Sequence, residues 1–250
     1  MSKFIVITSG KGGVGKTTTA VNLAIAMNNL DEDVTLVDAN LTTPNIGLHL
    51  GAPVVPVTLN HVLSKKADLA DSVYEHESGT KIIPSSLSIK ELKKLDINNL
   101  MSIRKELRNL SDTIIFDCAA GLGNEAIVPI SIADEVIIVT NPEMPAVTDA
   151  LKTSKLAEEM GKKVKGVIIT KLNGKKSEMS VKSIAEMLEL PILGIVPYDE
   201  KIQESISMRN AVILTHPNSK SSKSYMEIAA KILGKEIPKK KSFFSRLFNL

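Results

Sequence analysis

The segment with the most specific chemistry is "SGKGGVGKTTTA" at residues 9–20, which follows an apolar run and opens a helical pattern. Residues 10–17 match the pattern G-x-x-x-x-G-K-[ST] in full. Glycines allow the backbone to curl, so that successive N–H groups point at phosphate oxygens. Lys16 supplies a positive charge for the β- and γ-phosphates, the Thr17 hydroxyl can bind Mg²⁺, and the helix N-terminus adds its dipole. The motif therefore predicts a nucleoside-triphosphate site; the alternative is a glycine-rich turn that binds nothing.

Three further residues could act on the same phosphates or on their Mg²⁺. Lys11 lies inside the loop, where an ordinary phosphate loop requires no lysine, and its charge could act where the γ-phosphate leaves; the alternative is a solvated loop lysine. The apolar run "TIIF" leads to Asp117, which we expect beside the loop, holding Mg²⁺ through water. Gly121 could then offer a backbone N–H to the γ-phosphate. Cys118, the only cysteine, is expected to be a small buried strand residue.

These residues must be positioned by short runs rich in Val and Ile that alternate with helical patterns. The expected strands end in turn residues and lie at 3–10, 33–40, 80–86, 112–118, 135–142, 164–173 and 190–197. Helices are expected at about 17–29, 97–110, 145–160, 177–189 and 219–234. This alternation predicts right-handed crossovers and an α/β fold, in which a mostly parallel twisted sheet carries helices on both faces.

Length and composition are those of one soluble globular domain. The 250 residues are 43% hydrophobic and 24% charged, without a run of about 18 apolar residues that could span a bilayer. The chain enters its first apolar run without a basic leader, which argues against secretion. One cysteine excludes a disulfide within the chain, and the four scattered histidines lack metal-ligand spacing. We therefore expect a cytoplasmic protein.

Several segments together resemble the MinD/ParA family of P-loop ATPases with a deviant Walker A motif, over nearly the whole chain. They are "KGGVGKT", "TLVDANLTTPNIG", "TIIFDCAAG" and "VTNPEMPAVTDA". The resemblance is greatest to the MinD branch, the archaeal type included. It implies ATP and Mg²⁺ as ligands, a homodimer with ATP and a monomer otherwise, and a Lys11 that reaches the partner's ATP. The nucleotide contacts that it implies in the loop are Gly12, Gly13, Val14, Gly15, Lys16, Thr17 and Thr18.

The segment that resembles the family's switch I departs from its pattern. The family reads Asp-x-Asp, and its second aspartate positions or activates the attacking water, whereas this chain reads Asp38-Ala39-Asn40. Asp38 remains available to the Mg²⁺ shell, but Asn40 can hydrogen-bond a water without taking its proton. We therefore expect slow hydrolysis and a long-lived ATP state; the alternative is that Asn40 substitutes adequately. In addition, Ala119 replaces a proline of the family's switch II, which is a mild departure from the family's pattern.

The resemblance also indicates where the adenine base of the nucleotide would bind. The site lies between the end of a strand late in the chain and a P-x-D loop that follows it. The matching positions are Thr170, Lys171 and Asn173, then Pro197, Tyr198 and Asp199. The family often has an arginine where this chain has Lys171, and lysine stacks on a base less well than the planar guanidinium. A preference for adenine is thus implied by the resemblance and not by these residues.

The chain ends in "KKKSFFSRLFNL", which combines cations with an apolar stripe. Read as a helix, residues 242–250 gather their apolar side chains mostly on one side. These side chains are Phe243, Phe244, Leu247, Phe248 and Leu250. The net charge of the chain is +3, and Lys239, Lys240, Lys241 and Arg246 contribute +4, so the other residues sum to −1. The pattern is typical of a helix in a membrane interface with its cations on anionic headgroups; the alternatives are a tail that folds back onto the domain or a dimer contact.

We therefore predict an ATPase domain at 1–234, a basic linker at 235–241 and a membrane-targeting helix at 242–250. The predicted protein is a MinD-like ATPase that attaches reversibly to the cytoplasmic face of the membrane. It would position the division site or another polar assembly, with a protein activator or cargo that the sequence does not name.

Other functions agree with only part of the sequence. A DNA-segregation ATPase of the ParA type shares the loop, but the body charge and the Phe-rich tail argue against DNA, for which Lys162, Lys163 and Lys165 are the cluster to test. An iron–sulfur carrier needs paired cysteines, and a tyrosine-kinase relative needs a tyrosine-rich tail, whereas the last tyrosine here is Tyr225. An ATP-binding scaffold with little hydrolysis stays open because of Asn40.

Overall fold

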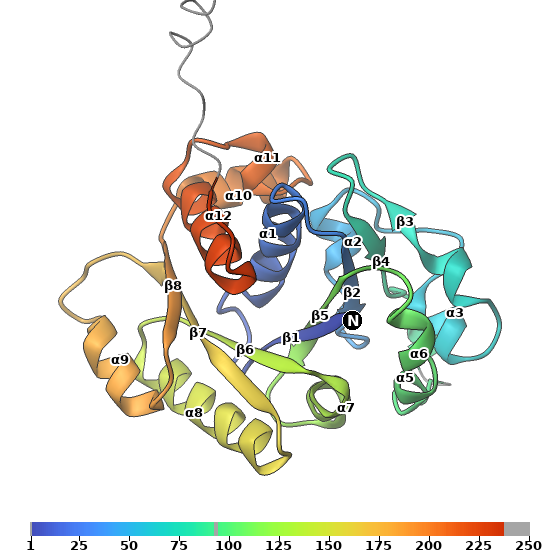
Figure 1. Cartoon of the computed structure of the whole chain (residues 1–250), viewed down its shortest axis with the longest axis horizontal. Coiled ribbons are helices and arrows are strands. Elements are labelled where there is room, and N and C mark those ends of the chain that lie inside the picture. The colour runs from blue at the N-terminus through green and yellow to red at the C-terminus, as the bar shows by residue number, and fades with distance from the viewer. Residues whose placement is uncertain (1, 93–94, 238–250) are drawn as a thin grey trace, which may run out of the picture.

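The computed structural model describes residues 2–92 and 95–237, which form a twisted sheet between two layers of helices (Figure 1). The strands are β1 (Lys3–Ser9), β2 (Val34–Ala39), β3 (Tyr74–Glu75), β4 (Lys81–Ile83), β5 (Thr113–Ala120), β6 (Glu135–Thr140), β7 (Lys163–Leu172) and β8 (Ile192–Pro197). Their order in the sheet is β3-β4-β2-β5-β1-β6-β7-β8, and every neighbouring pair is parallel except β3 with β4. The predicted α/β fold with a mostly parallel sheet is confirmed.

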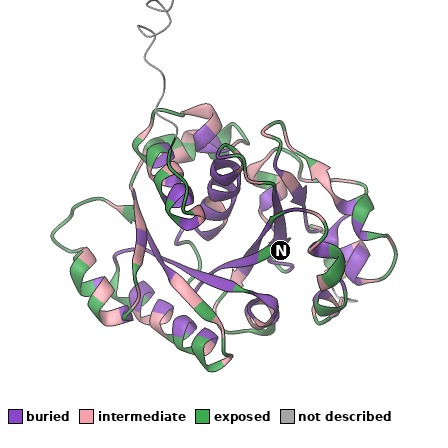
Figure 2. Ribbon diagram, in the orientation of Figure 1, coloured by how far each residue is buried: buried purple, intermediate pink, exposed green. Residues whose placement is uncertain are grey.

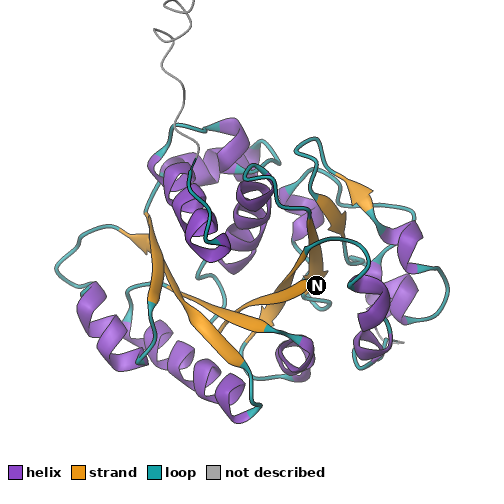
Figure 3. Cartoon of the chain, viewed as in Figure 1, coloured by secondary structure: helices purple, strands orange, loops and turns teal. Residues whose placement is uncertain are grey.

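Helices connect most of the strands along the chain, and β3 is followed directly by β4 (Figure 3). In chain order they are α1 (Lys16–Asn28), α2 (Ile46–His49), α3 (Leu59–Leu63), the 3₁₀ helix η1 (Leu69–Ser72), α4 (Ile89–Leu92), α5 (Asn99–Ser102), α6 (Arg104–Leu107), α7 (Asn124–Ile132), α8 (Met144–Glu159), α9 (Val181–Leu188), α10 (Glu200–Ser207), α11 (Val212–Thr215) and α12 (Lys220–Leu233). Helices α1, α10, α11 and α12 lie on one side of the sheet, and α7, α8 and α9 lie on the other (Figure 1).

The core consists of two apolar layers, one on each face of the sheet. Successive side chains of a strand point to opposite faces, so a strand covered on both sides must be apolar at every position. In β1, Phe4 and Val6 join the layer that includes α7 and α8, whereas Ile5 and Ile7 join the layer that includes α1 and α12. The central strands are accordingly buried along most of their length (Figure 2). This burial explains why the strands are continuous Val/Ile runs in the sequence.

Most predicted elements are present, with informative differences. The predicted helices at 17–29, 145–160 and 219–234 correspond to α1, α8 and α12, while the one at 177–189 begins only at Val181, after the Ser180 cap. The helix predicted at 97–110 is wrong as a continuous element, because two four-residue helices, α5 and α6, occupy its place. Helix α7 was not predicted: its sequence "NEAIVPISI" is a nearly continuous apolar run that contains Pro129. Within the described ranges, no helix combines the length and the apolarity that crossing a membrane would need.

Candidate functional site

The loop that we call the phosphate loop, residues 10–17, connects the carboxyl end of β1 to the start of α1. Gly13 and Gly15 have φ values of 78° and 89°, in the left-handed region that glycine enters at little cost. Gly15 is the N-cap of α1, and no side chain caps the helix. The first backbone N–H groups of this 13-residue helix are therefore left for another acceptor, as an anion-binding helix N-terminus requires.

Lys16, Thr17 and Asp117 meet at the start of α1, although Asp117 is 101 residues after Lys16 in the chain. The ammonium of Lys16 lies 3.0 Å from Oδ1 of Asp117, and the Thr17 hydroxyl donates to Oδ2 at 2.6 Å. Asp117 is fully buried and Lys16 is 8% exposed. Because β5 is the neighbour of β1, the pairing of these two strands brings Asp117 under the loop. The structure thus brings together the three side chains that the sequence assigned to phosphate and metal.

Asp38 lies directly across from Asp117, since the two residues are paired in the register of β2 and β5. Its carboxylate is fully buried and accepts hydrogen bonds from the backbone N–H groups of Asn40, Asn45 and Ile46 at 3.2, 2.9 and 3.0 Å. Burial, and then the charge of Asp117, raise the pKa of Asp38 to about 8, although the three N–H groups act in the opposite direction. A cation between the two carboxyl groups would relieve their repulsion.

The donor set at this point fits Mg²⁺. The Thr17 hydroxyl and the carboxyl groups of Asp38 and Asp117 are the hard oxygen donors that this ion prefers. Across the residues that the structure describes, no group of three or more His, Cys, Asp or Glu side chains could hold a metal ion. Water and phosphate oxygens would therefore supply most ligands, which is the usual coordination of Mg²⁺ in nucleotide sites.

The side chain of Asn40 forms its hydrogen bonds within its own loop. Its side chain is 6% exposed, and its amide nitrogen donates to the carbonyl of Thr43 at 2.7 Å. Its amide oxygen accepts from the Thr43 hydroxyl at 3.1 Å and from the Thr43 N–H at 3.4 Å. Both ends of the amide are thus used to close the turn at residues 40–43, so Asn40 shapes this loop in the structure.

The other two residues assigned to the γ-phosphate also have protein partners. Lys11 is exposed and lies 3.5 Å from the carboxylate of Glu143, the residue that precedes α8. The N–H of Gly121 donates to the carbonyl of Ser9 at 2.9 Å. Both groups are therefore bonded to other parts of the protein. A contact of either one with a γ-phosphate would require that it exchange its present partner for the phosphate.

The residues assigned to the base divide into two groups. Thr170 is buried, and its hydroxyl donates to the carbonyls of Val14 and Thr140 at 2.5 and 3.1 Å. Lys171 donates to the carbonyl of Gly13 at 2.6 Å. These two residues support the phosphate loop, while the N–H of Asn173 donates to Glu178.

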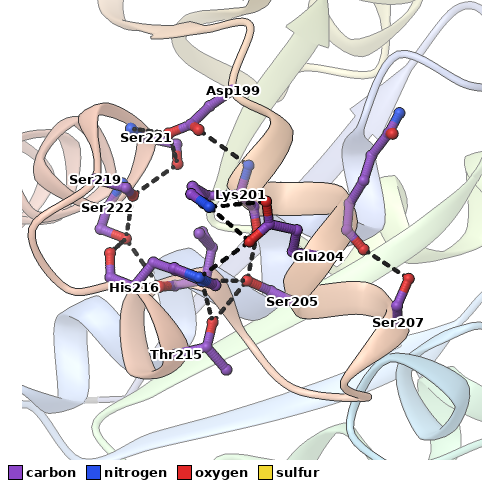
Figure 4. A network of polar contacts seen from close by, with 12 residues as sticks. Asp199, Lys201, Glu204, Ser205, Ser207, Thr215, His216, Ser219, Ser221 and Ser222 are labelled. Atoms are coloured by element: carbon purple, nitrogen blue, oxygen red, sulfur yellow. Dashed lines mark hydrogen bonds and ion pairs between the residues drawn. The ribbon is translucent and has the colours of Figure 1, made fainter.

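The second group lies after β8, where Pro197 ends the strand and Tyr198 is 46% exposed. Asp199 joins two helices: its carboxylate accepts from the N–H of Lys201 in α10 and from the N–H and hydroxyl of Ser221 in α12 (Figure 4). A pocket of about 380 Å³ opens beside it, lined by Tyr198, Asp199, Glu200, Lys201, Ser219 and Lys220. Asp199 therefore connects the two helices that contribute residues to this pocket.

Two acidic residues at this edge of the sheet were not singled out from the sequence. Glu143 pairs with Lys11, and Glu125 in the first turn of α7 accepts hydrogen bonds from Thr42 in the loop after β2. The available signal was their position, since both follow the loops at the carboxyl ends of β5 and β6. A rule that collects acids near such strand ends would have found them.

The basic cluster proposed as a test of DNA binding lies at the opposite, amino-terminal edge of the sheet. Lys163 and Lys165 lie 3.4 and 2.9 Å from the carboxylate of Glu135, and Lys3 lies 3.6 Å from it. Burial disfavours the charged form of Glu135, but Lys165 and the other lysines outweigh it and lower its pKa. Lys162 donates to the carbonyl of Ala133.

The residues predicted to bind the membrane, from Lys239 to Leu250, lie outside the described residues.

A glycine-rich loop between a central parallel strand and a helix, with a lysine, a threonine and an aspartate gathered at its end, defines a P-loop nucleoside triphosphatase. Comparison with known families specifies the class further. Residues 1–233 match the model of the ParA family, described as an iron-transfer P-loop NTPase of the NUBPL type. The chain belongs to the ParA family of P-loop NTPases.

Individual proteins similar to this chain agree with this assignment. An uncharacterized ATP-binding protein of Methanocaldococcus jannaschii is 36% identical, covering 98% of this chain and 95% of that protein. The septum site-determining protein MinD of a Synechocystis strain is 32% identical, with coverage of 95% and 92%. The structure of MinD from Pyrococcus horikoshii, complexed with Mg-ADP, has a TM-score of 0.89 at 30% identity, covering 93% of this chain and 96% of that one.

The iron transfer in the description of the family model has no counterpart in the cysteines of this chain. Cys118 is its only cysteine, and the side chain is fully buried in β5. Burial raises the pKa of the thiol and thereby disfavours the thiolate that binds iron. One buried thiol does not provide the pair of cysteines that an iron–sulfur carrier presents.

Proposed function

We propose that this chain binds ATP with Mg²⁺ and hydrolyses it slowly. The observation that carries the proposal is the meeting of Lys16, Thr17 and Asp117 at the N-terminus of α1, under a complete phosphate-loop motif. In that geometry Lys16 and the helix N-terminus would hold the β- and γ-phosphates, and Thr17 and Asp117 would hold Mg²⁺, with Asp38 available to its outer shell. Bound Mg²⁺ would neutralise charge that develops on the phosphates. The Mg-ADP in the related MinD supports this choice of ligands.

We further propose that ATP drives dimerisation and that the dimer attaches to an anionic membrane. The exposure of Lys11 at the edge of the site supports a contact with a partner subunit. On the membrane, each of the four tail cations contributes about 1 kcal/mol, and the partly buried apolar side chains add to this. Ordering the nine residues of one tail costs about 1–2 kcal/mol per residue in backbone entropy. One tail is thus marginal, whereas two tails on a dimer gain roughly 10²–10⁴ in avidity.

The proposed biological role is spatial positioning, of a division site or of another polar assembly. The name of the Synechocystis relative, a septum site-determining protein, supports this role. A protein activator or cargo would then use the ATP-bound dimer at the membrane, and hydrolysis would release it to the cytoplasm.

Co-sedimentation with anionic liposomes tests the membrane switch. We expect the full-length protein to pellet with ATP and not with ADP, and a chain that ends at Lys241 to stay in the supernatant with either nucleotide. Neutral phosphatidylcholine liposomes are the control for charge. Absence of pelleting in both nucleotide states would contradict the switch and favour DNA binding of the ParA type. Equal pelleting with ATP and ADP would favour an ATP-binding scaffold instead.

Slow hydrolysis is tested by Asn40→Asp, which restores the carboxylate that the family carries. We expect the single-turnover rate to rise at least about tenfold, because a carboxylate can accept the proton of the attacking water. The same change removes the bond to the Thr43 carbonyl and places two oxygens against each other, which costs about 1–3 kcal/mol of stability. Asn40→Ala, which breaks the turn without adding a base, separates the two effects. A rate for Asn40→Asp no higher than that of the wild type would contradict slow hydrolysis caused by Asn40.

A further inference from the structure

We propose that Glu125 is a positioning residue that holds the loop after β2, residues 40–45, in place for ATP hydrolysis, acting through Thr42. The inference rests on the proposed ATPase function and adds a residue to it. Its basis is the set of contacts around this loop. In the sequence analysis, Asn40 was the one residue of the loop expected to contact the attacking water.

The loop is closed from inside by Asn40. Because the amide of Asn40 bonds to Thr43 at both ends and is nearly inaccessible, it fixes the turn: its oxygen accepts two hydrogen bonds and its nitrogen donates one. The turn itself is exposed at Thr42 and Thr43. Asp38 holds the two ends of the loop through the N–H groups of Asn40 and Asn45. The exposed middle of the turn is left for contacts with a neighbouring element.

Glu125 supplies that contact from α7. Its two carboxylate oxygens accept from the backbone N–H of Thr42, at 3.3 Å, and from the Thr42 hydroxyl. Glu125 is the second residue of α7, so the helix N-terminus stabilises its negative charge. The contact spans 83 residues of sequence and joins the loop after β2 to the helix that follows the loop after β5.

These two loops follow the strands that carry Asp38 and Asp117, the two candidate Mg²⁺ ligands. A bidentate contact between them fixes one loop against the other before nucleotide arrives. Preorganisation of this kind matters for phosphoryl transfer, because the reaction depends on positioning and electrostatics more than on covalent chemistry. Because ADP lacks the γ-phosphate, its affinity should not depend on the position of this loop.

The test uses a double-mutant cycle of Glu125→Gln and Thr42→Val in the full-length chain, with Thr42→Ser as the conservative control. The measurements are single-turnover ATP hydrolysis, ADP affinity, and amide hydrogen exchange of residues 40–45 without nucleotide. We expect each single change to lower the rate roughly fivefold, with the double variant no slower than either one. Thr42→Ser should stay within about twofold of the wild type, and ADP affinity should not change. Exchange in 40–45 should become faster in Glu125→Gln and Thr42→Val.

Independent, multiplying effects of the two changes on the rate would overturn the proposal, as would unchanged exchange together with an unchanged rate. Loss of ADP affinity in parallel with the rate would also overturn it, because that result would indicate general damage to the fold. If the wild type itself hydrolyses no ATP, the proposed function fails, and faster exchange in the variants would still support Glu125 as the residue that positions the loop.

Discussion

Replacing Lys16 by methionine is expected to abolish ATP hydrolysis and to lower the free energy of unfolding at pH 7 by about 3–5 kcal/mol. The second effect follows from burial. Asp117 is fully buried, and the Lys16 ammonium at 3.0 Å is its partner of opposite charge. Methionine has a similar length and no charge, so the change leaves a carboxylate in a low-dielectric interior. Among the described residues, the Thr17 hydroxyl is then its remaining hydrogen-bond donor. Urea unfolding and a single-turnover assay measure the two effects separately.

Two matched variants sharpen this experiment. Adding Asp117→Asn to Lys16→Met removes the unpaired charge, so most of the stability should return while hydrolysis stays absent. Lys11→Met makes the same chemical change in the same loop, but Lys11 and Glu143 are exposed and 3.5 Å apart, so stability should change by less than about 1 kcal/mol. If Lys16→Met proved as stable as the wild type, or if the double variant recovered no stability, the buried pair would not have the importance assigned to it.

Gly10→Ala is expected to lower the free energy of unfolding by about 3 kcal/mol and to weaken ADP binding at least about tenfold. A Cβ at this position would lie 2.2 Å from the carbonyl carbon and oxygen of Asp149 in α8. Both atoms belong to the backbone, so no side-chain rotation can relieve the overlap. Either the phosphate loop or α8 must shift, and the loop's N–H groups would then no longer converge on one point.

Gly12→Ala is the control for this prediction. A Cβ on Gly12 meets nothing within 4 Å, and its φ is outside the left-handed region. Its stability should therefore stay within about 1 kcal/mol of the wild type. Thermal or urea unfolding of both variants gives the comparison. Equal stability of Gly10→Ala and Gly12→Ala would show that the contact between the phosphate loop and α8 does not limit the fold.

The local features of this protein could be predicted because their causes are local. The phosphate loop is eight consecutive residues whose glycines and helix start form one structure, so its function follows from spacing alone. Buried parallel strands are continuous apolar runs for the reason that both faces are covered, as Phe4 and Ile5 illustrate in β1. The predictions of secondary structure failed where the local sequence pattern and the tertiary context disagree. Examples are α7, with its internal Pro129, and the two short helices α5 and α6 in place of one long helix.

The pairing of distant residues was decided by the tertiary structure. The type of residue 117 is visible in the sequence, but its contact with Lys16 exists because β5 is inserted beside β1, and its opposition to Asp38 exists because of the β2–β5 register. Likewise, the sequence shows that residue 40 is an asparagine and therefore no proton acceptor. That its amide closes a turn, and that Glu125 holds the same turn, depends on hydrogen bonds whose partners are chosen by packing. Spacing along the chain determines which groups are present; strand order and register determine which of them meet.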